Sequence, residues 1–126
     1  MKILIVDDSL LDRKLLSRTL TNAGVKNEII QAENGEAALQ LIAQNLDQLA
    51  LIFLDYQMPN MSGVELMQGL MNIPATAGIP MVMCTASVAE ESKQAAYAVN
   101  PKLAGYIAKP YKPVEVLSTI KPYVQF

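Results

Sequence analysis

The sequence predicts an α/β fold in which a parallel five-stranded sheet is covered by helices on both faces. Three observations predict it. Five short apolar runs alternate with five segments of helical character along 126 residues, a length typical of one domain. Three of these runs carry only apolar side chains, as parallel strands buried on both faces do. Finally, each helical segment begins at a residue suited to capping or starting a helix.

The first half of the chain supplies two strands and two helices. Lys2–Val6 is the first strand, and Ser9, three residues before Asp12, is a predicted N-cap for the first helix. Gly24 marks the turn to the second strand, Glu28–Ala32, and Asn34 caps the second helix. The residues predicted to face the core are Leu11, Leu15, Leu16 and Leu20 in the first helix, and Ala38, Leu41, Ile42 and Leu46 in the second.

The second half continues the alternation. Its predicted strands are residues 49–54, 79–84 and 104–108, with Gly78 marking a turn. Ser62 and Glu65 form a capping box for the third helix, and Ser87 and Glu90 form another for the fourth. Pro113 suits the first turn of the last helix. The residues predicted to face the core are Val64, Met67 and Met71 in the third helix, and Val116, Leu117, Ile120 and Val124 in the last.

The strength of the apolar runs suits one strand order. The second and fifth runs are the weakest, which suits the edges of a sheet. Strict alternation of strands and helices requires right-handed crossovers, and the order 2-1-3-4-5 leaves those two strands outermost. Ligands of such sheets bind beyond the carboxyl ends of the strands, at the point where the winding reverses. Here that point lies between the first and third strands.

The missing residue types exclude several kinds of active site. The chain has no histidine, so it has no Ser/His or Cys/His catalytic pair and no imidazole metal ligand. Its single cysteine, Cys84, excludes an internal disulfide and a cysteine zinc site, and suits a small buried side chain. No apolar run is long enough to span a bilayer, and no signal peptide precedes the first strand. We therefore expect a cytoplasmic domain without membrane insertion.

Charge is unevenly distributed along the chain. Residues 27–92 contain eight acids and no Lys or Arg, whereas residues 93–126 contain five Lys and one Glu. With a net charge of −2 the chain is a poor candidate for direct nucleic-acid binding. The basic segment suits either a partner-binding face or an ordinary solvated surface.

Polar residues follow four of the predicted strands. Asp7 and Asp8 come after the first strand and Asp55 after the third, while Thr85 and Lys109 end the fourth and fifth. Three carboxylates in one crevice would raise the pKa of at least one of them unless a cation is bound. Carboxylates, a backbone carbonyl and waters are the usual ligands of Mg²⁺. The sequence therefore predicts an Mg²⁺ site with an ammonium group beside it.

Four segments together match a known family. They are residues 3–9 (ILIVDDS), 55–63 (DYQMPNMSG), 85–86 (TA) and 106–110 (YIAKP). In this order and spacing they make the chain resemble the receiver domain of bacterial two-component response regulators, of the single-domain, chemotaxis-regulator kind. The resemblance covers residues 1–126 as one domain. It implies a flavodoxin-like, doubly wound (βα)5 sandwich of three layers.

The resemblance also implies a reaction. Asp55 would accept a phosphoryl group from a phosphohistidine of a sensor histidine kinase or histidine phosphotransfer protein. Asp8, Asp55 and the carbonyl of Gln57 would hold Mg²⁺, with Asp7 acting mostly through a water. Lys109 would pair with the phosphoryl oxygens, and its bond to Pro110 is a cis-peptide site in the family. The domain would be a signalling phosphoacceptor that catalyses only its own phosphotransfer and dephosphorylation.

Phosphorylation would be sensed through two further side chains. In the family the hydroxyl at Thr85 turns toward the phosphoryl group, and the aromatic residue at Tyr106 swings inward. This biases a surface made of the fourth helix, the fifth strand and the fifth helix, on which a downstream protein target would bind. Lys93, Lys102, Lys112 and Lys121 map to the same surface, which favours the partner-binding interpretation of the basic segment.

The resemblance also gives roles to positions that affect the lifetime of the phosphoryl group and the contacts with a partner. Gln57 and Ser87 would flank the path of the hydrolytic water, and Ala86 leaves room for the kinase histidine. Met58 and Met61, in the loop after Asp55, could touch a partner. The remaining methionines between them and the end of the fourth strand suit core filling, namely Met67, Met71, Met81 and Met83.

Three other functions fit the sequence less well than a receiver does. A phosphatase or mutase of the haloacid-dehalogenase kind needs an acid two residues after Asp55, where Gln57 stands. A flavin-binding flavodoxin-like domain needs a phosphate loop rich in Ser, Thr and Gly, whereas the acidic loop at Asp7 and Asp8 would repel phosphate. A degenerate receiver that serves only for docking usually loses a pocket residue, and none is missing. The sequence leaves open whether the receiver stands alone or belongs to a longer chain.

Overall fold

The computed structural model describes residues 1–86 and 89–126. Its five parallel strands lie in the order β2-β1-β3-β4-β5, which confirms the predicted fold and strand order. The strands are β1 Lys2–Val6, β2 Glu28–Ala32, β3 Leu49–Asp55, β4 Met81–Thr85 and β5 Gly105–Ala108. The helices are α1 Leu10–Asn22, α2 Gly35–Gln44, α3 Gly63–Met71, α4 Pro74–Ala77, α5 Glu90–Val99 and α6 Pro113–Ile120, with short 3₁₀ helices at Leu46–Gln48 and Lys121–Tyr123.

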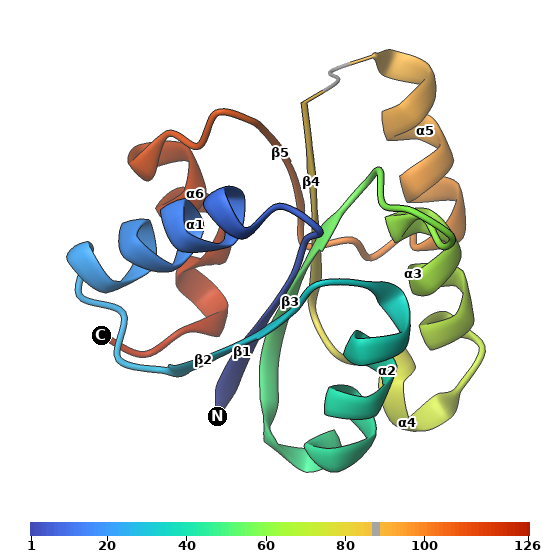
Figure 1. Ribbon diagram of the computed structural model, residues 1–126, viewed down its shortest axis with the longest axis horizontal. Helices are drawn as coiled ribbons and strands as arrows, with labels where there is room; N and C mark the ends of the chain where they lie inside the picture. The colour runs from blue at the N-terminus through green and yellow to red at the C-terminus, as the bar shows by residue number, and fades with distance from the viewer. Residues whose placement is uncertain (87–88) are drawn as a thin grey trace.

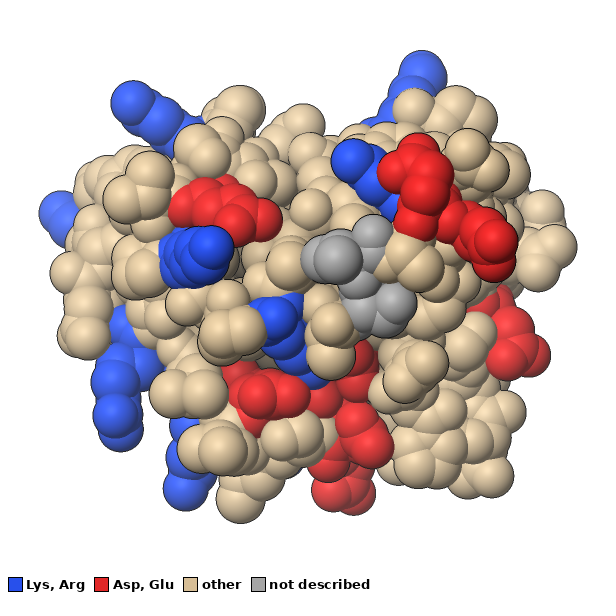
Figure 2. Space-filling view, turned by 90° about the horizontal axis from the view of Figure 1, so that it is seen from above, with Lys and Arg blue, Asp and Glu red and all other residues tan. Residues whose placement is uncertain are grey.

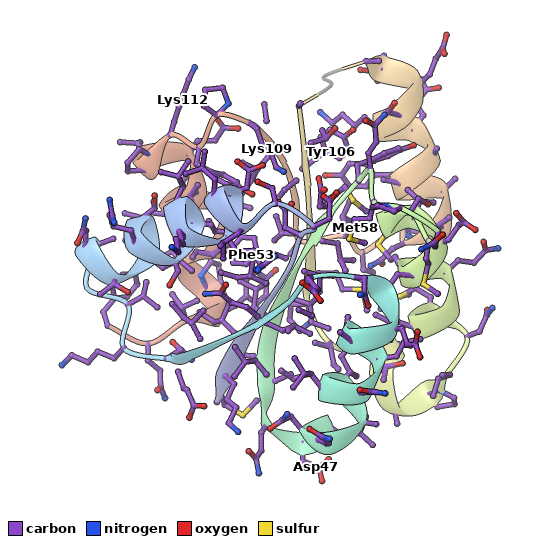
Figure 3. The ribbon with its side chains drawn as sticks, viewed as in Figure 1. Asp47, Phe53, Met58, Tyr106, Lys109 and Lys112 are labelled. Atoms are coloured by element: carbon purple, nitrogen blue, oxygen red, sulfur yellow. The ribbon has the colours of Figure 1, made fainter. Side chains whose placement is uncertain are left out.

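The helices form two layers, one on each face of the sheet (Figure 1). Helices α1 and α6 cover one face, and α2, α3 and α5 cover the other. Side chains of β1 alternate between the layers, so that Ile3 and Ile5 pack under α1 and α6 while Leu4 and Val6 face α2 and α3. Phe53 of β3 is buried in the α1/α6 layer (Figure 3). This burial on both faces explains the continuously apolar central strands.

Most predicted caps are present. The side chains of Ser9 and Asn34 accept hydrogen bonds from the first turns of α1 and α2. Ser62 and Glu65 form a complete capping box at α3, and Pro113 is the first residue of α6. The second predicted box is wrong, because α5 begins at Glu90 with Ala89 as its N-cap. Glu90 is therefore the first helical residue rather than the third, and Ser87 lies outside the described residues.

The predicted core face of α1 is half wrong. Leu16 and Leu20 are fully buried, but Leu11 and Leu15 are 65% and 43% exposed. At about 100° per residue, Leu11 and Leu15 lie well away from the direction of the two buried leucines. In the first turn of α1, the residues on the buried face are instead Asp12, four residues before Leu16, and Arg13. Leu46 is also misplaced, since it lies in the 3₁₀ helix after α2 and is largely exposed.

Several features of the α2/α3 layer were not predicted. Leu66 and Leu70 of α3 are buried in the core, and the short helix α4 follows α3. Met67, Met81 and Met83 are fully buried, as the core interpretation of the methionines predicts. Met58, Met61 and Met71 are partly buried and pack against the same cluster.

Candidate functional site

The predicted site residues meet at the carboxyl end of the sheet. Seen from above, acidic side chains gather beside a basic one near the middle of this face, while most other Lys and Arg side chains lie over the α1/α6 side (Figure 2). Lys109 and Tyr106 lie near this end of the sheet, and Asp47 lies at the opposite end (Figure 3). Because parallel strands all end at this edge, residues from β1, β3, β4 and β5 reach it together.

Three carboxylates form the acidic group that the sequence predicts. One oxygen from each of Asp7, Asp8 and Asp55 lies within 4.8 Å of the others. Asp7 and Asp55 are buried at the ends of β1 and β3, and Asp8 is exposed. Burial, and then the charge of Asp7, raises the pKa of Asp55 to about 7, and Lys109 offsets only part of this rise. Such a group of hard oxygens, with uncompensated negative charge, suits a divalent cation such as Mg²⁺.

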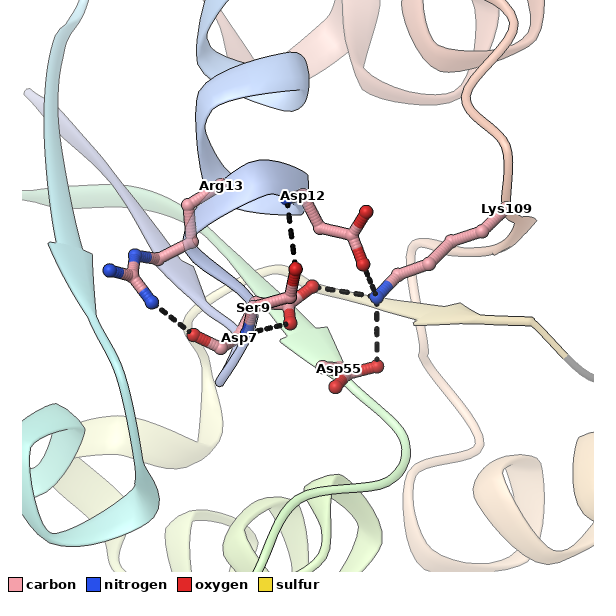
Figure 4. A network of polar contacts seen from close by, with 6 residues as sticks. All are labelled: Asp7, Ser9, Asp12, Arg13, Asp55 and Lys109. Carbon is pink, nitrogen blue, oxygen red and sulfur yellow. Dashed lines mark hydrogen bonds and ion pairs between the residues drawn. The ribbon is translucent and has the colours of Figure 1, made fainter.

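Lys109 is held by several carboxylates at once (Figure 4). Its Nζ donates to Asp7 Oδ2 at 2.7 Å, to Asp12 Oδ2 at 2.9 Å and to Asp55 Oδ1 at 3.2 Å. These carboxylates raise the pKa of Lys109 above that of an ordinary lysine although burial opposes the rise. The side chain therefore carries a full charge at neutral pH. The peptide bond between Lys109 and Pro110 is cis.

The backbone around Asp7 is also fixed by polar contacts (Figure 4). The Ser9 N–H donates to Asp7 Oδ1 at 2.9 Å, and Arg13 Nη1 donates to the Asp7 carbonyl oxygen at 2.7 Å. Arg13 also donates from Nε to Gln31 Oε1, which joins α1 to β2. Arg13 and Asp12 were not predicted to belong to the site. The available signal was their position on the same face of α1 as Leu16 and Leu20.

The loop after Asp55 is held close by a glycine. The Gly63 N–H donates to the Tyr56 carbonyl, and a Cβ at Gly63 would collide with the Asp55 carbonyl oxygen. Asn60 in the same loop has a positive φ of 71°. Gln57 is exposed beside Asp55. The sequence DYQMPNMSG thus forms a tight loop, closed by the hydrogen bond from Gly63 to Tyr56.

Thr85 and Tyr106 lie side by side on neighbouring strands. Thr85 is buried at the end of β4, and its carbonyl accepts from the Lys109 N–H at 2.8 Å. Burial raises the pKa of Tyr106, and the Thr85 hydroxyl offsets part of that rise. The Tyr106 hydroxyl oxygen is itself buried. Tyr106 also lines a cavity of about 190 Å³ with Glu90, Lys93, Ala108 and Glu115.

Fold and site together define a doubly wound α/β protein with a group of three carboxylates and a partly buried lysine at the carboxyl end of its sheet. Residues 3–121 match the family model of the response regulator receiver domain, and the chain belongs to this family. It is 33% identical over 113 residues to a chemotaxis protein CheY homolog of Campylobacter jejuni, covering 90% of this chain and 84% of that protein. It is 35% identical over 119 residues to the phosphate regulon regulator PhoB of Pseudomonas aeruginosa, covering 94% of this chain but about half (49%) of PhoB.

Solved structures agree with this assignment. The Vibrio cholerae chemotaxis protein CheY4 superimposes with a TM-score of 0.83 at 31% identity, covering 97% of both chains. A putative response regulator from Chloroflexus aurantiacus gives 0.85 at 30% identity, covering 97% of this chain and 95% of that one. The chain is thus a receiver domain like those of CheY-type response regulators, which are phosphoacceptors in two-component signalling. Receiver domains bind Mg²⁺ at an acidic cluster of the kind found here.

Proposed function

We propose that Asp55 is the phosphoacceptor of this receiver domain, and that the donor is a phosphohistidine of a histidine kinase or histidine phosphotransfer protein in the cytoplasm. A carboxylate oxygen of Asp55 forms a bond to phosphorus while the phosphorus–nitrogen bond breaks. The departing imidazole nitrogen keeps the electron pair. The observation that carries the proposal is the Lys109 ammonium, fixed at 3.2 Å from Asp55 Oδ1 beside the three-carboxylate group.

The other pocket residues have distinct proposed roles. Asp8, Asp55 and the Gln57 carbonyl would hold Mg²⁺, with Asp7 acting mostly through a water. Bound there, the cation supplies charge that offsets the electrostatic repulsion between the carboxylates and the incoming phosphoryl group. Lys109 would pair with a phosphoryl oxygen. The chain's own contribution is to keep these groups in place before the donor arrives, which lowers the cost of transfer.

Thr85 and Tyr106 would transmit the modification. A phosphoryl group on Asp55 offers new acceptors to the Thr85 hydroxyl, which lies against Tyr106. Because the Tyr106 hydroxyl is already buried, phosphorylation would stabilise this position rather than create it. The responding surface consists of α5, β5 and α6, to which a downstream protein would bind. Next to Tyr106 the charges are mixed, since Lys93 lies with Glu90 and Glu115, so a general basic attraction does not define the partner there.

The test is the intact mass of the protein after incubation with acetyl phosphate. We expect one added phosphoryl group that requires Mg²⁺ and is absent in Asp55→Asn. Asp47→Asn, which removes an exposed acid at the opposite end of the sheet, should react like the wild type. A folded protein that gains no phosphoryl group under any condition would overturn the proposal, and the domain would then act in docking alone.

A further inference from the structure

Asp12 is a fourth carboxylate in the pocket and contacts Lys109 as closely as the others do. Its Oδ2 lies 2.9 Å from Nζ of Lys109, between the distances to Asp7 and Asp55. It does not belong to the three-carboxylate group that could hold a metal ion. Its side chain is 30% exposed, against 3% for Asp7 and 8% for Asp55. Asp12 therefore pairs with Lys109 from the solvent side of the pocket.

The direction of the Asp12 side chain is not that of an ordinary helix cap. Asp12 follows the N-cap Ser9 at the position where, in α3, Glu65 reaches back to the Ser62 N–H. In α1 the Ser9 N–H is already bonded to Asp7 Oδ1. The Asp12 carboxylate is thereby released from the cap and points to Lys109 instead (Figure 4). The starts of α1 and α3 thus differ in what the third helical residue does.

All donors of Lys109 are occupied in this arrangement. A lysine ammonium has three N–H groups, and three carboxylates accept from it. A phosphoryl oxygen can bond Lys109 only by displacing one of them. Phosphorylation itself changes Asp55, and a metal ion would compete for Asp7 and Asp55, but neither acts directly on Asp12. Asp12 is thus the partner of Lys109 that neither the phosphoryl group nor the cation would engage directly.

We propose that Asp12 is a positioning residue that competes with the phosphoryl group for Lys109, and so weakens the binding of phosphoryl groups in this pocket. This inference rests on the proposed function of Asp55. Lys109 would divide its hydrogen bonds between Asp12 and the phosphoryl oxygens. Without Asp12, one N–H of Lys109 would be released for the phosphoryl group, while the contact with Asp7 would remain.

The test compares Asp12→Asn with Glu65→Gln, its matched control. Both changes remove the charge of the third residue of a helix, but only Asp12 contacts Lys109. The first readout is the affinity for trifluoroberyllate with Mg²⁺, an anionic phosphoryl mimic, followed by fluorine NMR. The second is the rate of Asp55 phosphorylation by acetyl phosphate, followed by intact mass. We expect both to rise about tenfold in Asp12→Asn, a factor at the lower end of what a charge-assisted hydrogen bond contributes, and to stay unchanged in Glu65→Gln.

Salt separates a contact from a general charge effect. At about 1 M NaCl the screening length falls to about 3 Å, so repulsion across the pocket is largely removed while a direct contact is less affected. The increase should persist there. An increase that disappears at high salt, or a decrease in affinity in Asp12→Asn, would overturn the positioning role. Asp12→Ala serves as a second variant, with folding of each checked by circular dichroism.

Failure of this inference is distinguishable from failure of the proposed function. If the wild type binds the mimic and forms the Asp55 adduct, and both Asp12 variants match it, only the role of Asp12 is refuted. If the wild type does neither, the phosphoacceptor proposal is refuted and the role of Asp12 falls with it.

Discussion

Removing the charge of the proposed phosphoacceptor should stabilise the fold. Asp55 is buried at the end of β3 and lies beside Asp7, and both factors disfavour its ionised form. Asn at this position keeps the size of the side chain but removes the charge. Lys109 retains Asp7 and Asp12 as partners after the change. We therefore expect Asp55→Asn to raise the free energy of unfolding when no divalent cation is present.

The magnitude follows from the pKa of Asp55, which is raised from 3.8 to about 7 in the folded state. At about 1.36 kcal/mol per pKa unit, ionisation of the folded state costs roughly 4 kcal/mol. A buried Asn amide with incomplete hydrogen bonding costs about 1–2 kcal/mol, which reduces the gain from removing the charge. We expect a net gain of roughly 2–3 kcal/mol near pH 8.

The pH dependence has a defined sign. Between the unfolded pKa and the folded one, the folded state binds more protons than the unfolded state. The stability of the wild type therefore falls across this interval as pH rises, relative to the variant, and the difference is constant above about pH 7. Below the pKa of Asp55 in the unfolded state, its carboxyl is protonated in both the folded and the unfolded protein. Asp55→Asn therefore has no stability advantage at such pH.

Urea unfolding followed by circular dichroism measures these differences. Samples in EDTA at about pH 4, 6 and 8 should show an increasing gain for Asp55→Asn. Saturating Mg²⁺ should reduce the gain, because a cation that binds only the folded state stabilises the wild type more than the variant. Asp47→Asn is the control for losing one exposed acid. A variant that is equal to or less stable than the wild type at pH 8 in EDTA would refute the reasoning.

Three further outcomes are expected from the same pocket and core. Gly63→Ala should destabilise the protein by about 2 kcal/mol or more, because the added Cβ would collide with the Asp55 carbonyl. In Gly69→Ala, also in α3, the added Cβ would meet nothing within 4 Å. This variant should instead stabilise the protein by up to about 1 kcal/mol in the same urea assay. Lys109→Met should lower the free energy of unfolding by about 3–5 kcal/mol because it leaves buried carboxylates without their cationic partner. Thermal melting should show that Mg²⁺ partly restores the stability of this variant, and a variant as stable as the wild type in EDTA would contradict this account. Burial raises the pKa of Cys84 to about 12. Iodoacetamide at about pH 8 should therefore modify the folded protein at least about 100-fold more slowly than the urea-unfolded chain, as measured by intact mass. Equal rates would show that the thiol is accessible in the folded protein.

The sheet could be predicted from the sequence because its strands are subject to one strong constraint. Leu51, Ile52 and Phe53 are buried on both faces of β3, which leaves no room for polar residues and makes the strand visible as an apolar run. The edge strand β2 has exposed and half-buried positions and a correspondingly mixed sequence. The site followed from the same logic, since residues directly after parallel strands must share one edge.

The helices were less predictable because packing decides which residues are buried. Leu11 and Leu15 are apolar yet exposed, because they lie on the side of α1 that faces away from the buried Leu16 and Leu20. Asp12 matched a capping pattern, but the cap's N–H was already bonded to Asp7. The start of α5 at Glu90 depends on the path of the chain after β4, which no local motif specifies. In each case the deciding contact comes from a distant part of the chain or from a competing local bond.

The pocket holds more negative than positive charge, and a bound cation would reduce this excess. Asp7, Asp12 and Asp55 contact the Lys109 ammonium group, and Asp8 adds a further negative charge beside Asp7 and Asp55. The nearby Arg13 is engaged with a backbone carbonyl and with Gln31. A fold selected for stability alone would neutralise one of the buried acids, as Asp55→Asn does. The retained charge instead disfavours the empty pocket and so favours a bound cation, because only groups that bind the folded state recover the lost stability. On this argument the charge of Asp55, which costs the fold roughly 4 kcal/mol, would favour the binding of a cation. Under the proposed function it would favour phosphoryl transfer as well, and Asp12 would limit how much of Lys109 is available for the phosphoryl group.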